Sequence, residues 1–300
     1  MAGVSALGCC WLIGGTGDSG AIARRLSELA VPYVVTVTTA AARALYPEGA
    51  CVEVGKLSLQ TAQAFVERCG VRCVADVSHP FAREVSEMAI AVARERRIPY
   101  LRYERPLVGG SPASFEAASP TQRLGQRALA DTQADWQEGV VRAGSLDALV
   151  DDSRLRGQLE GQRVLFTIGY RHLGKFAGLR ARSRLFARVL PSKEAIAGAR
   201  GAGFEASELI ALRPPISLAL EMALWQQWDI SCVVARASGK PSGWGGEQVK
   251  REAARALGVR LMLVDRPVLS YPHKTERLES VIGFCQKNLA CFSRKGGNSL

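Results

Sequence analysis

Residues 9–20 read CCWLIGGTGDSG, an apolar segment that runs directly into a glycine-rich turn. Gly15, Gly17 and Gly20 match the spacing G-x-G-x-x-G, which permits a tight turn, a close approach of the backbone to a pyrophosphate, and close packing of helix on strand. The helix that begins here would present free N–H groups to a phosphate. The stretch predicts a nucleotide-binding unit, and a glycine turn that serves only packing is the alternative.

Short apolar and β-branched runs alternate with helical patterns along the rest of the chain. In the first half we predict strands at Cys9–Gly14, Pro32–Thr38, Val71–Val77 and Ile98–Tyr103, and a helix with Phe81, Val85, Met88 and Val92 on one face. In the second half we predict strands at Val164–Ile168, Leu185–Leu190, Glu208–Leu212, Ile230–Ala235 and Val259–Asp265, and helices at Ser217–Trp228 and Gly246–Leu257. The pattern indicates an α/β fold of two Rossmann-like parallel-sheet domains around a central cleft.

A segment rich in Gly, Ser and Pro separates the two halves, from Pro106 to about Pro120. We therefore expect an N-terminal cofactor-binding domain at 1–112, a C-terminal substrate domain at 113–272, and a C-terminal helix with a basic tail at 273–300. Val71–Pro106 and Ile230–Pro267 show the same order of elements, and each ends in Arg-Pro. Either duplication or ordinary βαβ spacing explains this weak repeat.

Composition places the chain among globular proteins, because 47% of its 300 residues are hydrophobic and 22% are charged. It has no apolar run of the roughly 18 to 20 residues that a membrane helix needs, and its start has no signal-peptide pattern. We therefore expect a cytoplasmic protein without membrane contact. The 8 cysteines include no C-x-x-C pair, and the 3 histidines are far apart, so buried thiols are favoured and no metal is expected.

Positive charge is concentrated in one segment of a chain whose net charge is +11. Between Gly161 and Gly203 there are 9 Lys and Arg residues against the single acid Glu194. Such a field attracts nucleic acid, anionic lipid, phosphate cofactors or a polycarboxylate substrate, and a solvated basic face is the plainer alternative. Nucleic acid is disfavoured, because no helix-turn-helix, RRM or zinc signature accompanies the charge.

The second predicted strand ends in hydroxyl groups, where an NAD site usually has a carboxylate for the ribose 2′-hydroxyl. A carboxylate would repel a 2′-phosphate, whereas hydroxyls and the later Arg43 accept it. NADPH is therefore predicted over NADH, unless Thr36 and Thr38 are only strand formers. The expected cofactor residues are Gly14, Gly15, Thr16, Gly17, Asp18, Gly20, Thr38, Thr39 and Arg43.

Loops at the ends of three other predicted strands carry the remaining candidate residues. Ser78-His79-Pro80-Phe81-Ala82 follows the third strand, and Pro80 keeps His79 extended at the edge of the sheet. Because histidine titrates near neutrality, His79 or a water held by it and Ser78 is the expected proton donor. The loops Thr167–Arg171 and Arg236–Lys240 present glycines, hydroxyls and cations that would bind carboxylates or simply form turns.

These motifs together resemble the precorrin-6A reductase family of cobalamin biosynthesis over residues 9–268. The resemblance rests on Gly14–Gly17, Ser78–Ala82, the two Arg-Pro pairs, Thr167-x-Gly169 and Ser238-Gly239. It implies two Rossmann-like domains and NADPH-dependent reduction of a ring double bond, converting precorrin-6A or its cobalt form to precorrin-6B. The macrocycle bears acetate and propionate groups, so the expected substrate-binding residues are Arg171, Arg182, Arg236, Ser238, Gly239 and Lys240.

Two departures from the family pattern concern ligand contacts. Arg236 stands where family members commonly have lysine, which keeps the charge, and residues 38–43 replace the usual Ser-Leu-Ala-Gly-Arg. The rival functions are another NADPH-dependent reductase on the same scaffold, an NADPH-sensing protein without turnover, and a nucleic-acid binder. Neither of the first two would oxidise NADPH when given the tetrapyrrole.

Overall fold

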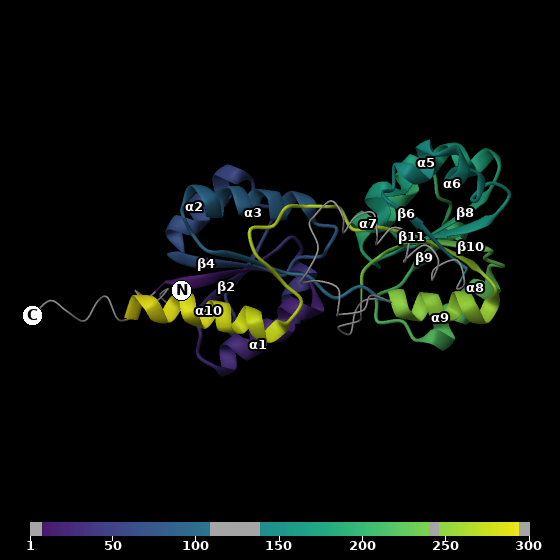
Figure 1. Cartoon of the computed structure of the whole chain (residues 1–300). Helices are drawn as coiled ribbons and strands as arrows, with labels where there is room; N and C mark the ends of the chain where they lie inside the picture. The colour runs from purple at the N-terminus through teal and green to yellow at the C-terminus, as the bar shows by residue number, and fades with distance from the viewer. Residues whose placement is uncertain (1–7, 109–138, 240–245, 294–300) are drawn as a thin grey trace, which may run out of the picture. The chain divides into compact units, whose positions relative to one another are not determined.

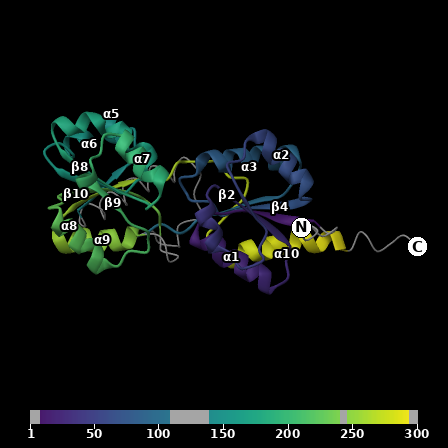
Figure 2. The ribbon, with the colours of Figure 1, turned by 180° about the vertical axis from the view of Figure 1, so that it is seen from behind.

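The computed structural model describes residues 8–108, 139–239 and 246–293. The chain divides into two compact units, the first joining Met1–Arg105 to Val268–Leu300 and the second comprising Pro106–Pro267. Each unit is a parallel sheet with helices on both faces (Figures 1 and 2). Among the described residues, no helix combines the length and the apolar composition of a membrane span.

The first unit contains a six-stranded sheet in the order β12-β5-β4-β1-β2-β3. Its strands are β1 (Cys9–Ile13), β2 (Tyr33–Val37), β3 (Val52–Val54), β4 (Val71–Asp76), β5 (Tyr100–Tyr103) and β12 (Lys274–Thr275). Helices α1 (Gly17–Glu28) and α10 (Leu278–Ser293) cover one face, and α2 (Leu59–Arg68) and α3 (Arg83–Glu95) cover the other (Figure 1). The 3₁₀ helix η1 (Ala40–Leu45) follows β2.

The second unit contains another six-stranded sheet, in the order β6-β11-β10-β7-β8-β9. Its strands are β6 (Val140–Ala143), β7 (Arg163–Phe166), β8 (Arg184–Val189), β9 (Leu209–Ala211), β10 (Cys232–Arg236) and β11 (Arg260–Val264). Helices α8 (Leu218–Gln227) and α9 (Glu247–Leu257) lie on one face, and α5 (Ala148–Asp151), α6 (Ser153–Gly157) and α7 (Lys193–Gly201) on the other (Figure 1). The 3₁₀ helices are η3 (Tyr170–Ala181) and η4 (Ala206–Glu208).

The two sheets have the same strand order along most of their width. The run β5-β4-β1-β2-β3 corresponds to β11-β10-β7-β8-β9, so the repeated order of elements predicted from the sequence is confirmed. The outermost strand differs in origin. The C-terminal segment supplies β12 to the first sheet, whereas β6 enters the second sheet from the amino-terminal part of its own unit.

The strands predicted from the sequence agree with the structure to within two residues at each end. Every residue of β1 is buried, as expected for a parallel strand covered on both faces, and the Trp11 Nε1 donates to Thr36 Oγ1 at 2.8 Å. One expectation was wrong in detail, because Phe81 lies before α3 rather than on its apolar face. The helix begins only after the turn that contains Pro80.

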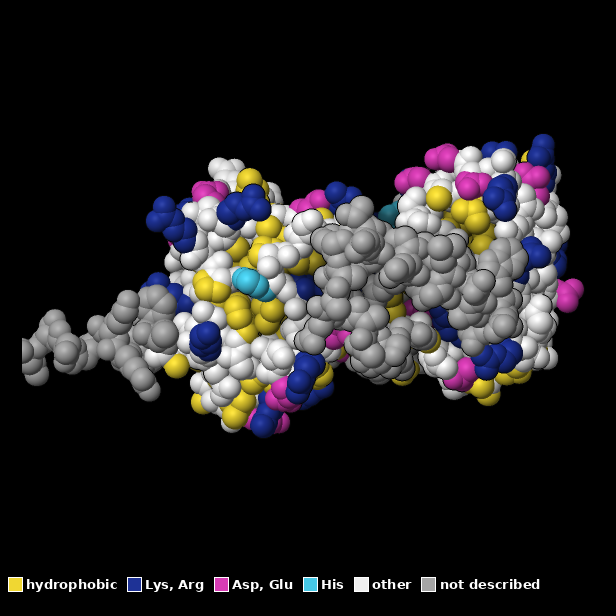
Figure 3. Space-filling view, in the orientation of Figure 1, with side chains coloured by type: hydrophobic (Ala, Val, Ile, Leu, Met, Phe, Trp, Pro, Cys, Tyr) yellow, Lys and Arg dark blue, Asp and Glu magenta, His cyan; other side chains and the backbone are white. Residues whose placement is uncertain are grey.

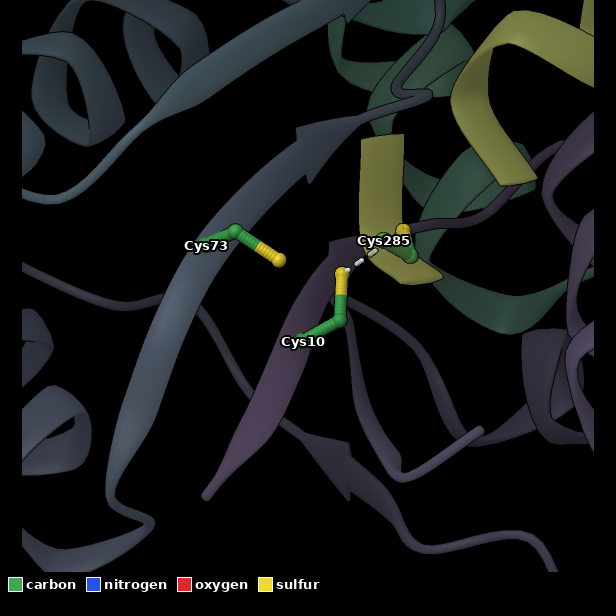
Figure 4. Close-up of side chains that lie close together, drawn as sticks. All are labelled: Cys10, Cys73 and Cys285. Atoms are coloured by element: carbon green, nitrogen blue, oxygen red, sulfur yellow. Dashed lines mark hydrogen bonds between the residues drawn. The ribbon is translucent and has the colours of Figure 1, made fainter. Parts of the chain in front are cut away.

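Three thiols from distant parts of the sequence meet in the core of the first unit. Cys10 of β1, Cys73 of β4 and Cys285 of α10 point toward one another, with their sulfur atoms within 4.8 Å (Figure 4). All three are fully buried among aliphatic side chains, and Cys285 Sγ lies 3.3 Å from Cys10 Sγ. Hydrogen bonding between Cys10 and Cys285 raises the pKa of Cys10 and lowers that of Cys285. Their burial among aliphatic side chains suits thiols that pack as small side chains.

Candidate active site

The turn after β1 requires glycine at three positions, because a Cβ would collide at two of them and the third has a positive φ. A Cβ on Gly14 would lie 2.1 Å from the Tyr46 hydroxyl oxygen, and one on Gly20 would lie 2.6 Å from the Leu45 carbonyl oxygen. Gly15 has φ of +96°, which side chains disfavour, and nothing lies within 4 Å of its Cβ position. The motif therefore packs closely against the segment after η1 and leaves the turn open at Gly15.

The first turn of α1 has the geometry of an anion site. Thr16 caps the helix, since its hydroxyl accepts from the Ser19 amide at 3.1 Å and donates to the Val77 carbonyl at 2.9 Å. The amides of Gly17 and Asp18 are the first two of a 12-residue helix and have no intrahelical acceptor. With the positive end of the helix dipole, they fit the phosphates of a dinucleotide.

Two side chains at the glycine turn, one from the motif and one from the segment after η1, make hydrogen bonds within the protein. The buried carboxylate of Asp18 pairs with Arg105, which is also buried, so a cofactor contact of Asp18 falls to its backbone amide. The pairing cancels a negative charge that would repel phosphate. The Tyr46 hydroxyl accepts from the Gly15 amide at 2.7 Å and lies 2.8 Å from Ser19 Oγ, so the Gly15 amide is already used.

The end of β2 presents the residues predicted to select NADPH. Thr38, Thr39 and Arg43 are exposed, and Thr39 precedes η1. The Arg43 guanidinium donates to the Val52 carbonyl at 3.4 Å. Thr36 is buried and accepts from Trp11, so it belongs to the core and not to the ligand site.

Ser78 and His79 lie beside the glycine turn because β1 and β4 are neighbouring parallel strands. The Val77 amide donates to the Ile13 carbonyl at 3.0 Å, and Val77 in turn accepts from Thr16. His79 is half-buried, and its Nδ1 accepts from the Phe81 amide at 3.3 Å. The hydrogen of the neutral imidazole is therefore assigned to Nε2, which makes that atom the donor.

A buried ion pair that sequence reasoning missed lies directly behind Ser78. Arg102 Nη1 donates to Asp76 Oδ1 at 2.8 Å and to Ser78 Oγ at 2.9 Å. Both charged side chains are fully buried. The available signal was a carboxylate at the end of one apolar strand and a guanidinium inside the next, because buried opposite charges require each other.

The carboxyl edge of the second sheet brings together three cationic or titratable side chains. Tyr170 packs against Gly198, and the Arg171 guanidinium lies 5.4 Å from the Tyr170 ring. Burial and the nearby Arg171 lower the pKa of Arg236, at the end of β10, to about 10. Burial, followed by Arg236, also lowers the pKa of His172. Such an excess of positive charge favours the binding of carboxylates.

Other predicted substrate residues have different surroundings. Arg182 lies at the opposite edge of the sheet, before β8, and donates to both Glu160 carboxylate oxygens at 3.1 Å. Ser238 is buried, and the Gly239 amide donates to Glu247 Oε2 at 2.7 Å, so both build the turn after β10. Lys240 lies outside the described residues.

Much of the basic segment is neutralised by acids from outside it. Five of its cations form ion pairs: Lys175–Asp147, Arg180–Glu208, Arg182–Glu160, Arg188–Glu221 and Arg200–Glu205. On the face shown in Figure 3, basic and acidic side chains are interspersed. The net charge of the sequence therefore overstates the positive field of this segment.

Comparison with known proteins extends over both units. A family model described as "Precorrin-6x reductase CbiJ/CobK" matches residues 10–286. Cobalt-precorrin-6A reductase of Synechocystis sp. is 39% identical over 288 residues, covering 95% of this chain and 99% of its own. Precorrin-6A reductase of Rhodococcus erythropolis is 29% identical over 275 residues, covering 91% and 94%. The solved structure "CobK precorrin-6A reductase" covers 94% of this chain and 97% of its own, with a TM-score of 0.69 and 21% identity, and supports the fold.

Proposed function

This chain belongs to the precorrin-6x reductase family, and we propose NADPH as its reductant and cobalt-precorrin-6A as its preferred substrate. The family assigns it to cobalamin biosynthesis, as an oxidoreductase that reduces a carbon–carbon double bond of a tetrapyrrole. The proposal for NADPH rests on one observation. The open turn at the start of α1 lies in the same unit as exposed hydroxyls and a guanidinium at the end of β2.

In this proposal the first unit holds the cofactor by hydrogen bonds from backbone and side chains. The Gly17 and Asp18 amides bind the pyrophosphate, and Thr38, Thr39 and Arg43 bind the 2′-phosphate. When bound, NADPH supplies the hydride. The protein contributes the orientation of the nicotinamide and the exclusion of water.

The second unit supplies the charge for the substrate. Arg171 and Arg236 bind acetate or propionate groups through charge-assisted hydrogen bonds, and Ser238 and Gly239 shape the adjoining turn. Arg182 is left out because it lies at the opposite edge and is paired with Glu160. The cobalt form is favoured because the Synechocystis relative, 39% identical over nearly the whole chain, is named for it.

Reduction also requires a proton, and His79 is the proposed donor. The acid is the imidazolium form, which gives up one proton and returns to the neutral ring whose Nδ1 accepts from the Phe81 amide. The Ser78 hydroxyl lies next to it in the chain and assists. We also propose that the enzyme works in the cytoplasm, where a reduced nicotinamide nucleotide is supplied.

The test mixes the purified protein with each nicotinamide nucleotide and each form of the ring in four combinations. Oxidation is followed in the near-ultraviolet absorbance band of the reduced nicotinamide. We expect oxidation only when a tetrapyrrole is present, with kcat/KM higher for NADPH than for NADH and higher for cobalt-precorrin-6A than for the metal-free ring. Equal rates with both nucleotides would contradict the 2′-phosphate contacts, and a preference for the metal-free ring would contradict the assigned substrate.

A further inference from the structure

The buried pair Asp76–Arg102 joins two neighbouring strands below the candidate active site. Asp76 ends β4, Arg102 lies opposite it on β5, and their closest atoms are 2.8 Å apart. Neither side chain is exposed. Buried ion pairs of this kind are weak evidence for stability, because an apolar pair of similar volume often stabilises a protein as well or better.

The carboxylate of Asp76 is held in one orientation by hydroxyl donors from two elements. Its Oδ2 accepts from Ser86 Oγ of α3 and from the Tyr100 hydroxyl of β5, each at 2.6 Å. Burial alone would raise the pKa of Asp76, but Arg102 and the hydroxyl donors outweigh it and the pKa lies below its ordinary value. Asp76 is therefore ionised at neutral pH and fixes Arg102 in turn.

Arg102 makes fewer hydrogen bonds than a buried guanidinium usually does. Its Nη1 serves both Asp76 and Ser78, whereas within the described part of the chain its Nε and Nη2 have no hydrogen-bond acceptor. The Tyr271 ring lies 5.4 Å from the guanidinium carbon. Leaving buried N–H groups unsatisfied opposes folding, so stability alone is a poor explanation for an arginine at this position.

Ser78 is the residue on which this pair acts. Its amide donates to Asp76 Oδ1 at 3.0 Å, and its Oγ accepts from Arg102 at 2.9 Å. Arg102 has no acceptor to offer, so the hydroxyl hydrogen of Ser78 must point away from the pair. The preceding residue, Val77, is bonded to the Thr16 hydroxyl of the glycine turn, which keeps Ser78 beside that turn.

We propose that Asp76 and Arg102 form a positioning pair that holds the Ser78 hydroxyl as a hydrogen-bond donor toward the ligand bound at the glycine turn. The inference rests on the proposed function, because it requires a ligand at that turn. Arg102 acts through Ser78 and touches neither cofactor nor substrate. Its contribution is to orient Ser78 before the reaction.

The test is a double-mutant cycle on kcat with Arg102→Lys and Ser78→Ala. Lysine keeps the charge beside Asp76 but lacks the rigid planar guanidinium that holds Nη1 between Asp76 and Ser78. We expect Arg102→Lys to lower kcat about tenfold and to leave KM for the nucleotide within about twofold, as expected for one oriented hydrogen bond. In the Ser78→Ala background the same substitution should change kcat by less than about twofold, because its target is gone.

Two further variants separate positioning from folding. Ser86→Ala removes a donor from the far oxygen of Asp76 and keeps the Arg102–Ser78 bond, so it should lower the Tm yet retain kcat within about twofold. Should Arg102→Lys fail to fold, the uncharged pair Asp76→Asn with Arg102→Met replaces it in the same cycle.

An equal loss of kcat from the Arg102 substitution with and without Ser78 would overturn the inference, as would an unchanged kcat in Arg102→Lys. Turnover is measured with whichever reduced nicotinamide nucleotide the wild type oxidises. A preference for NADH would therefore contradict only the proposed cofactor, and the cycle would still decide the role of the pair.

Discussion

The two sheets share a strand order, but the charged side chains at their carboxyl edges differ. At the first edge, each of the two buried acids has a basic partner, in the pairs Asp18–Arg105 and Asp76–Arg102. At the second edge, burial lowers the pKa of His172 and of Arg236, and neighbouring cations lower both further, Arg236 acting on His172 and Arg171 on Arg236. In the proposed function, the amides and hydroxyls of the first edge orient the cofactor, and the cations of the second edge attract the carboxylates of the substrate.

The largest effect should come from closing the first edge with Gly14→Val. The new side chain would collide with Tyr46, whose hydroxyl oxygen lies 2.1 Å from the Cβ position. Displacing the Tyr46 hydroxyl, which holds the Gly15 amide, distorts the turn, and we expect a Kd for NADPH about 30-fold higher or more, which is about 2 kcal/mol of lost binding free energy. Fluorescence titration with NADPH measures this, and circular dichroism checks the fold.

Gly283→Ala is the matched control in the same unit. Gly283 is an exposed residue of α10, and nothing lies within 4 Å of its Cβ position. Alanine is the better helix former, so the Kd should stay within about twofold and the Tm should not fall. Normal NADPH binding by a folded Gly14→Val protein would refute the cofactor site.

At the second edge, Arg236→Met should raise KM for the tetrapyrrole about 10- to 100-fold, because one charge-assisted hydrogen bond is worth about 1.5–3 kcal/mol. The Kd for NADPH should change by less than about twofold. Arg182→Met removes a cation from the opposite edge of the same sheet, and its KM should be nearly unchanged. Equal losses in the two variants would show that the field of the whole unit matters rather than the cluster.

The variant His79→Ala tests whether a residue at the first edge donates the proton. Turnover should fall at least about tenfold through loss of the proton donor, while the affinity for NADPH stays largely intact. Steady-state kinetics, combined with a direct NADPH titration, separates the two quantities. Unchanged turnover would remove His79 from the mechanism.

The smallest effect concerns His172 and the pH dependence of stability. Its pKa is lower in the folded protein than the ordinary value of 6.5, so just below pH 6.5 the unfolded chain binds more protons. Stability should therefore decline as the pH falls from about 7 through this range. His172→Gln should weaken that dependence in Tm measurements, and an identical pH profile in both proteins would contradict the assignment.

Local patterns in the sequence were sufficient for the main strands but missed several shorter elements. Helix α7 buries only Ala195 and Ala199, β3 spans three residues, and α2 and β6 were also not predicted. The C-terminal helix α10 was predicted. Periodicity shows that a helix buries one face but does not identify its partner, and α10 packs on the first sheet beside α1.

In the candidate site, too, residues next to a strand end were predicted, and roles that depend on a partner distant in the sequence were not. The glycine turn and Ser78-His79 follow strand ends and were predictable, because the carboxyl ends of parallel strands collect ligands. The roles of Tyr46 and Arg102 were not, because each depends on a partner more than 20 residues away. Net charge misled for a similar reason, since five cations of the basic segment have acidic partners from outside it.

The most direct measurement titrates NADPH and cobalt-precorrin-6A separately into the wild type, Gly14→Val and Arg236→Met. If the first unit holds the nucleotide and the second holds the carboxylates, Gly14→Val loses affinity for NADPH alone and Arg236→Met for the tetrapyrrole alone. Loss of NADPH binding in Arg236→Met, with normal binding in Gly14→Val, would contradict this division of labour.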